Sequence, residues 1–146
     1  FGVYDKNLLS TFSRVAKNLD MKHVLVVHGD DGLDEISVTS ETSISELKDM
    51  QIKEYKISPT DFGLDFGTFE AITAQSSKDS LKMVNEAFEG TKSTVQDMIA
   101  MNAGAALYVA NKVTSIGSGI ELAFDLMNSG KAAEKLNAYV NASNNL

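Results

Sequence analysis

Apolar residues recur along this chain with two different spacings, and each spacing predicts a different kind of element. From Asp5, a suitable N-cap, to Leu19 the spacing is helical. One apolar stripe results, formed by Leu8, Leu9, Phe12, Val15, Ala16 and Leu19. Lys22 to Val27 then predicts a strand, and its unbroken run Val24-Leu25-Val26-Val27 is typical of a strand buried on both faces, as in a parallel sheet. A helix that leads into such a strand predicts an α/β fold.

Shorter segments downstream predict more β-structure. Alternating residues over Glu35 to Thr39 predict a half-buried strand. Thr42 to Leu47 and Gln51 to Ile57 flank the turn Lys48-Asp49-Met50, which predicts an antiparallel pair. Ser58-Pro59-Thr60-Asp61 places a cap residue, a first-turn Pro and an acidic N3 residue in succession, which predicts one helical turn.

From Lys78 onward the pattern is helical throughout. A first apolar stripe ends at Gly90, which is a natural helix terminator. Two later helices are predicted, one over Ile116 to Met127 and one over Lys131 to Val140. Asn141 to Leu146 predicts a frayed end.

The helix predicted between Gly90 and Ile116 is apolar nearly all round, which is typical of a buried helix. Thr91 or Ser93 can cap it, and its apolar positions extend to Val113. Gly104 in its middle predicts close packing against a second helix, because a mid-helix Gly costs about 1 kcal/mol relative to Ala. Asn102 predicts a buried amide with structural hydrogen bonds, and a substrate contact is the weaker alternative.

Candidate chemistry is concentrated directly after the first strand. His28-Gly29-Asp30-Asp31-Gly32-Leu33-Asp34-Glu35-Ile36-Ser37 contains four carboxylates. Ligands of open α/β sheets bind beyond the carboxyl ends of strands, and Mg²⁺ usually takes one or two protein carboxylates together with phosphate oxygens. The spacing does not match a calcium EF-hand loop. On composition alone, an acidic surface turn is the simpler interpretation.

The two histidines suggest no catalytic role. His23 is predicted to lie on the surface. His28 is predicted to bond to neighbouring backbone rather than to act as a base. The sequence contains neither a Ser-His-Asp constellation nor the ligands of a usual zinc site.

Composition narrows the function classes. The 146 residues suffice for one domain, and a net charge of −7 argues against a nucleic-acid partner. Cysteine is absent, which suits the reducing cytoplasm that we predict as the location. The longest weakly charged stretch, Met98 to Asn111, is too short to span a bilayer, so no membrane partner is expected.

The acidic stretch His28–Ser37 resembles the segment of anthranilate phosphoribosyltransferases that carries their magnesium pair. Three further stretches are similar to signatures of that family and occur in the same order. They are Gly2-Val3-Tyr4, Ser58-Pro59-Thr60-Asp61-Phe62-Gly63-Leu64 and Asn102-Ala103-Gly104-Ala105-Ala106-Leu107-Tyr108-Val109-Ala110. The resemblance covers essentially the whole chain, and the acidic stretch is its most specific part.

The resemblance implies a reaction and the residues that serve it. Members of the family transfer a phosphoribosyl group from 5-phosphoribosyl 1-diphosphate to anthranilate in tryptophan biosynthesis. Asp34 and Glu35 match the family's metal-holding pair, which implies Mg²⁺ as cofactor, and Asp30 and Asp31 would tune the local field. No protein nucleophile is required.

The resemblance also implies a place for this chain within a longer enzyme. We expect residues 1–146 to be the carboxy-terminal part of one mostly parallel-sheet α/β domain, strand-rich over 1–64 and helical over 65–146. The family's amino-terminal helical domain and phosphate loop are not found in this sequence, so we expect the chain alone to be inactive. The intact enzyme is expected to be a homodimer. Alternatives are a pyrimidine-nucleoside phosphorylase and a non-catalytic, nucleic-acid-binding relative.

Overall fold

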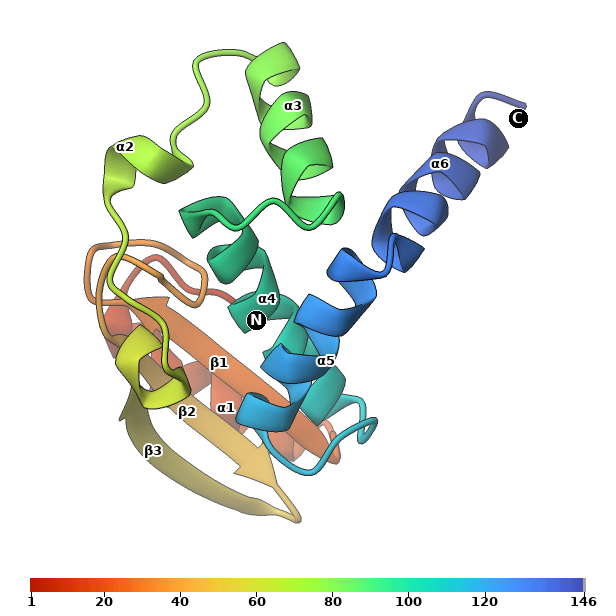
Figure 1. Ribbon diagram of the computed structural model, residues 1–146. Helices are drawn as coiled ribbons and strands as arrows, with labels where there is room; N and C mark the ends of the chain where they lie inside the picture. The colour runs from red at the N-terminus through yellow and green to blue at the C-terminus, as the bar shows by residue number, and fades with distance from the viewer. Residues whose placement is uncertain (146) are drawn as a thin grey trace.

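The computed structural model describes residues 1–145 as a three-stranded sheet with helices on both faces (Figure 1). The strands are β1 (His23–Gly29), β2 (Thr42–Lys48) and β3 (Gln51–Ile57), in the order β1-β2-β3. The helical elements are η1 (Lys6–Leu8), α1 (Leu9–Asn18), η2 (Pro59–Phe62), α2 (Phe69–Ile72), α3 (Ser77–Phe88), α4 (Thr94–Val109), α5 (Ile116–Asn128) and α6 (Lys131–Ser143). The predicted α/β class is confirmed. Leu146, at the predicted frayed end, lies outside the described residues.

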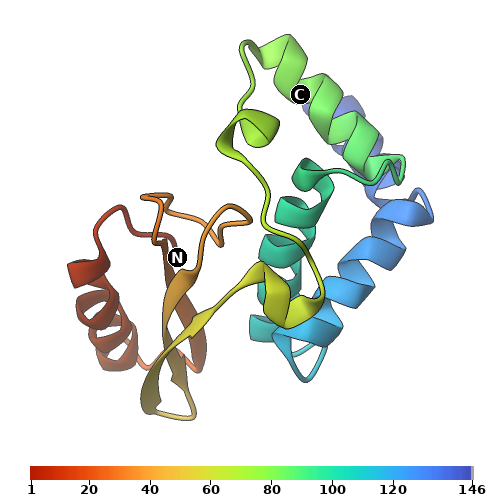
Figure 2. The same cartoon turned by 60° about the vertical axis from the view of Figure 1, so that its left-hand side comes forward.

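Strand β1 is buried on both of its faces, as its run of aliphatic residues predicts. Val24 and Val26 belong to a core shared with α1, whereas Leu25 and Val27 belong to a larger core shared with α4 and α5. Figure 2 shows α1 on one side of the sheet and α4 and α5 on the other. An alternating strand with a polar face would expose half of its side chains to water, and β1 has no such face.

The strands of this part of the domain pair antiparallel. We expected the chain to belong to a domain with a mostly parallel sheet; among the described residues, β1, β2 and β3 are antiparallel, and β1 also forms a parallel bridge between Gly2 and Val27. Parallel neighbours require a crossover connection, usually helical, and residues 30–41 join β1 to β2 without a helix. The predicted antiparallel pair is confirmed, with Asp49 and Met50 at φ of 49° and 61° forming its tight turn.

The predicted strand over Glu35 to Thr39 is wrong. This segment lies in the loop between β1 and β2, although Ile36 and Val38 are buried as their alternation suggested. Its backbone groups do not pair with a strand: the Ser37 N–H donates to Thr42 Oγ1 at 2.9 Å, and the Val38 carbonyl accepts from the Gly67 N–H at 2.9 Å. Alternation therefore identified the two buried apolar residues, but Ser37 between them is fully buried as well, and the backbone is not a strand.

Helices α4 and α5 cross at two facing glycines, which confirms the packing predicted from Gly104. A Cβ on Gly104 would lie 2.5 Å from the Ile120 nitrogen, and one on Gly119 would lie 2.2 Å from the Gly104 carbonyl oxygen. Ser93 caps α4, as predicted, but the helix ends at Val109 rather than extending to Val113. Asn111 ends the helical path there by adopting a φ of 54°.

The remaining helices follow the predicted pattern with three exceptions. Asp5 caps a 3-10 turn that precedes α1, Ser58 and Asp61 form a capping box on η2, and α3, α5 and α6 lie where helices were predicted. Helix α6 continues to Ser143, three residues into the segment that was predicted to be frayed. The short helix α2 was missed. The predicted stripe of α1 is only partly buried, because Phe12 and Val15 remain 43% and 49% exposed. Within residues 1–145, no helix has the length and apolar character needed to cross a membrane.

Candidate functional site

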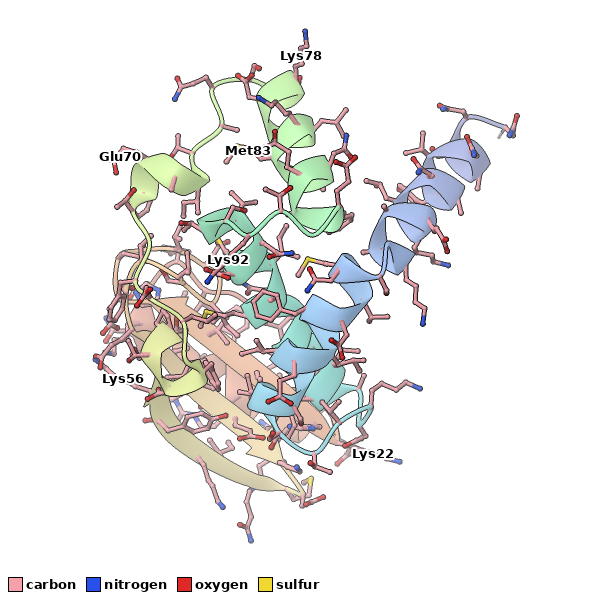
Figure 3. All side chains as sticks on the ribbon, viewed as in Figure 1. Lys22, Lys56, Glu70, Lys78, Met83 and Lys92 are labelled. Carbon is pink, nitrogen blue, oxygen red and sulfur yellow. The ribbon has the colours of Figure 1, made fainter. Side chains whose placement is uncertain are left out.

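The acidic loop, residues 30–41, leaves the carboxyl end of β1 and returns to β2 (Figure 1). Its first carboxylate, Asp30, has structural partners: it accepts from Lys56 Nζ at 2.6 Å and from Ser43 Oγ at 3.1 Å. The bond from Lys56 is the main reason why the pKa of Asp30 lies below its ordinary value. Lys56 is labelled in Figure 3 and also contacts Glu41 at 2.7 Å, so this cation joins both ends of the loop.

Asp31 organises the interior of the acidic loop. Its carboxylate accepts from Ser37 Oγ at 2.5 Å, from Thr39 Oγ1, and from the Leu33 N–H at 3.2 Å. Burial alone would raise the pKa of Asp31, but these donors outweigh burial and the pKa is lowered. A carboxylate with three internal donors is a structural anchor, and its oxygens are already used.

Asp34 and Glu35 are different from the two preceding carboxylates. Both residues are exposed, and their carboxylates have no hydrogen bond or ion pair with any of residues 1–145 that the structure describes. The acidic stretch thus divides into two carboxylates that build the loop and two that are available to a ligand.

The backbone that carries Asp34 and Glu35 is fixed on both sides. Before the pair, the Gly29 N–H donates to the Leu33 carbonyl at 2.8 Å. After the pair, the Asn102 side chain bonds to both backbone polar groups of Ile36. Two adjacent exposed carboxylates are therefore held on an ordered segment.

A cavity of about 430 Å³ lies beside the pair, between β1 and α4. Asp34, Glu35 and Ile36 line it from the acidic loop, and Asn102 lines it from α4. Leu25 and Val27 contribute apolar surface from β1. A cavity of this size is within the range of small-molecule sites, which combine mostly apolar walls with a few polar groups.

The carboxylates of Asp34 and Glu35 fit Mg²⁺ that shares its ligands with a substrate. They do not fit a metal ion whose ligands all come from the protein. Among the described residues, no group of three or more His, Cys, Asp or Glu side chains is close enough together to hold an ion. Asp34 and Glu35 offer two hard oxygen donors, and Mg²⁺ is commonly held by one or two carboxylates with substrate phosphate oxygens and water. The pair therefore suits a metal that arrives with a phosphate-bearing substrate.

Both histidines are occupied by structural contacts. His28 Nδ1 lies 2.8 Å from the Val3 carbonyl oxygen, as predicted. The prediction that His23 lies on the surface is wrong, since its side chain is 5% exposed and its Nε2 lies 2.8 Å from Glu46 Oε1. The ring also packs edge-on against Tyr108, with centroids 4.7 Å apart.

Glu46 is the centre of a buried network that was not predicted from the sequence. Besides His23, this carboxylate accepts from Tyr108 OH at 2.8 Å and from Tyr55 OH at 2.9 Å. Burial would raise the pKa of Glu46, but these bonds outweigh burial and lower it. The signal was present: Glu46 and Ile44 share one face of β2, and a carboxylate on a core-facing position requires buried donors.

Comparison with known proteins assigns this architecture to a family. The model of a glycosyl transferase family, a/b domain, matches residues 1–133. An anthranilate phosphoribosyltransferase from Vesicomyosocius okutanii is 42% identical over 142 residues, which are 97% of this chain and 42% of that protein. One from Halorhodospira halophila is 42% identical over 139 residues, covering 95% of this chain and 41% of that protein. The chain thus spans about two fifths of the length of these relatives.

Solved structures agree with the sequence relatives. The anthranilate phosphoribosyltransferase of Thermus thermophilus superposes with a TM-score of 0.86 at 28% identity, covering 95% of this chain and 41% of that one. The Saccharomyces cerevisiae enzyme, solved in complex with PRPP and Mg, has a TM-score of 0.86 at 22% identity, covering 99% and 42%, and shows the same fold. Since the family model matches nearly the whole chain, this chain belongs to the glycosyl transferase family, and its residues 1–133 match the a/b domain.

Proposed function

We propose that the intact protein containing these residues transfers the phosphoribosyl group of 5-phosphoribosyl 1-diphosphate to anthranilate, releasing diphosphate. The observation that carries the proposal is the free pair Asp34 and Glu35, fixed at the carboxyl end of the buried strand β1. Relatives that are 37–42% identical over most of this chain are named anthranilate phosphoribosyltransferases, which supports the same substrates here.

In this reaction, the residues of this chain would bind the metal ion and orient the diphosphate of the substrate. Asp34 and Glu35 would hold Mg²⁺ through their carboxylate oxygens, at the end of the sheet where ligands of α/β folds bind. An ion held by this pair would supply positive charge against the negative charge that develops on the departing diphosphate. Asp30 and Asp31, which bond within the protein, would act on the site by fixing the loop rather than by binding metal.

The proposal includes the place of this chain in a larger protein. We take residues 1–146 as the carboxy-terminal part of one α/β domain, strand-rich over 1–64 and helical over 65–146. The coverage of about two fifths of the relatives supports the view that this chain is one part of a longer protein, and we propose that other substrate contacts come from outside these residues. We propose that the isolated chain is inactive and that the intact enzyme is a cytoplasmic homodimer.

The relatives favour the transferase over the two alternatives. Neither a pyrimidine-nucleoside phosphorylase nor a nucleic-acid-binding protein is supported by the relatives described above, and the net charge of −7 opposes binding to a polyanion. The two enzyme classes consume different substrate pairs, so one experiment separates them.

The test is to supply the intact protein with each pair in parallel. With anthranilate, 5-phosphoribosyl 1-diphosphate and Mg²⁺, we expect anthranilate fluorescence to disappear and diphosphate to accumulate. With a pyrimidine nucleoside and inorganic phosphate, we expect no free base. Release of free base without consumption of anthranilate would refute the proposal.

A further inference from the structure

Asn102 makes an unusual contact with the acidic loop across 66 positions of sequence. Its Oδ1 accepts from the Ile36 N–H at 2.9 Å, and its Nδ2 donates to the Ile36 carbonyl at 2.8 Å. Nδ2 also donates to the Met98 carbonyl at 3.0 Å, one turn earlier in α4. The side chain thus bonds to both the N–H and the carbonyl of Ile36, as a paired strand would. Its bond to the Met98 carbonyl holds the side chain against its own helix.

The residue held in this way directly follows the candidate metal pair. Ile36 is 2% exposed, so its backbone groups have no ready replacement for the amide in solvent. On the other side of the pair, Leu33 is fixed by the Asp31 carboxylate and by the Gly29 N–H. The backbone is therefore fixed at Leu33 before the pair and at Ile36 after it, and Asn102 provides the second of these two anchors.

The support behind Asn102 is rigid. It lies on α4, which contacts the sheet on one side and α5 on the other, and the glycine crossing with α5 leaves little room for movement. Asn102 also lines the same cavity as Asp34 and Glu35. Its position thus links the helical core to the geometry of the metal pair.

We propose that Asn102 is a positioning residue, which holds the Ile36 backbone so that Asp34 and Glu35 present their carboxylates to one metal ion. The inference rests on the proposed metal role of the pair. Partners that orient metal ligands typically change metal affinity 10- to 100-fold when they are removed. Asn102 acts through Ile36, and its amide groups are already engaged with backbone.

The chain provides a matched control for a purely structural effect. Gln96 lies on the same helix, is 3% exposed, and donates from Nε2 to the Ala87 carbonyl at 3.2 Å and to Asn128 Oδ1 at 3.1 Å. Replacing it with Ala removes a buried amide from α4 without touching the acidic loop. Loss of stability should then be similar for Gln96→Ala and Asn102→Ala, whereas loss of metal affinity should not.

The experiment is a Mn²⁺ titration of the intact protein in the presence of diphosphate, followed by the electron paramagnetic resonance of free Mn²⁺. We expect Asn102→Ala to weaken Mn²⁺ binding about tenfold or more relative to wild type, and Gln96→Ala to leave it unchanged. Asn102→Asp keeps an acceptor for the Ile36 N–H but loses both donated bonds, so it should also weaken binding. In steady-state assays, the Mg²⁺ concentration for half-maximal rate should rise for Asn102→Ala more than kcat falls at saturating Mg²⁺.

Unchanged Mn²⁺ affinity in Asn102→Ala, or an equal loss in Gln96→Ala, would overturn the inference. A wild-type protein that binds no Mn²⁺ with diphosphate would overturn it as well, because there would be no ion to position. Failure of the proposed reaction alone is distinguishable, since it would abolish anthranilate consumption in wild type while the Mn²⁺ comparison still gave its predicted order.

Discussion

Gly2 should control the position of Asp34, because the two backbones are in direct contact. A Cβ built on Gly2 would lie 1.5 Å from the Asp34 carbonyl oxygen and 2.6 Å from the carbonyl carbon. Ordinary contacts of a Cβ begin at about 3.4 Å, so Gly2→Ala requires the two segments to separate by about 2 Å. The backbone angles of Gly2 are not in the left-handed region, so the effect is steric.

The cost of that separation follows from what holds each segment. The segment of Gly2 is paired with β1 through the Val3 N–H and the Val27 carbonyl at 3.0 Å, and the acidic loop is held through Ile36 and Leu33. Overpacking costs about 1–3 kcal/mol and each lost hydrogen bond about 0.5–1.5 kcal/mol. Gly2→Ala should therefore lower the free energy of unfolding by about 2–5 kcal/mol.

Urea denaturation followed by circular dichroism measures this loss, and a Mn²⁺ titration of the folded variant reports the displaced Asp34. Gly117→Ala is the control, because a Cβ there meets nothing closer than 3.7 Å. That variant should be as stable as wild type or more stable by up to about 1 kcal/mol. Wild-type stability and wild-type Mn²⁺ affinity in Gly2→Ala would refute the contact between Gly2 and the metal pair.

Three further substitutions test the fold. Glu46→Gln should cost about 2 kcal/mol at pH 7 in urea denaturation. Because the folded pKa of Glu46 is lowered, its stabilisation is present above the unfolded pKa of about 4.3 and is lost as pH falls through the folded pKa. The free energy of unfolding of the variant should therefore fall less steeply with acid than that of wild type. Equal pH profiles would contradict this. Gly104→Val should push α4 from α5 and lower the thermal midpoint by several degrees, whereas an unchanged midpoint would contradict the close crossing. Ser93→Ala should cost about 1 kcal/mol through loss of the α4 cap, and a wild-type denaturation midpoint would count against that cap.

Local chemistry made much of this fold predictable from the sequence. The run Val24-Leu25-Val26-Val27 indicated a strand covered on both faces, and Gly104 indicated a close helix crossing. Ser93 and Ser58 each begin a helix where their cap chemistry placed one. Each of these signals depends on a few neighbouring residues, so it can be recognised without knowledge of the tertiary fold.

The failures depend on contacts between distant segments. The alternation of residues 35–39 identified Ile36 and Val38 as buried, but Ser37 between them is buried too. The backbone N–H groups of Ile36 and Ser37 donate to the side chains of Asn102 and Thr42 rather than to a strand. His23 was placed on the surface because Glu46 and Tyr108, which enclose it, are 23 and 85 positions away. Composition alone did not distinguish the four carboxylates, and only the family resemblance separated Asp34 and Glu35 from Asp30 and Asp31. The internal donors that hold Asp30 and Asp31 became visible only in the folded chain.

The central claim is that Asp34 and Glu35 hold the divalent ion that accompanies the diphosphate of the substrate. The most direct test is isothermal titration calorimetry of the intact protein with 5-phosphoribosyl 1-diphosphate, with and without Mg²⁺. The variants Asp34→Asn and Glu35→Gln are compared with wild type and with the control Glu70→Gln. Glu70 is an exposed carboxylate on α2 (Figure 3), so its variant matches the change in charge. The account predicts that Mg²⁺ strengthens binding in wild type and Glu70→Gln, and that this enhancement is lost in both loop variants; full Mg²⁺ enhancement in both loop variants would contradict it.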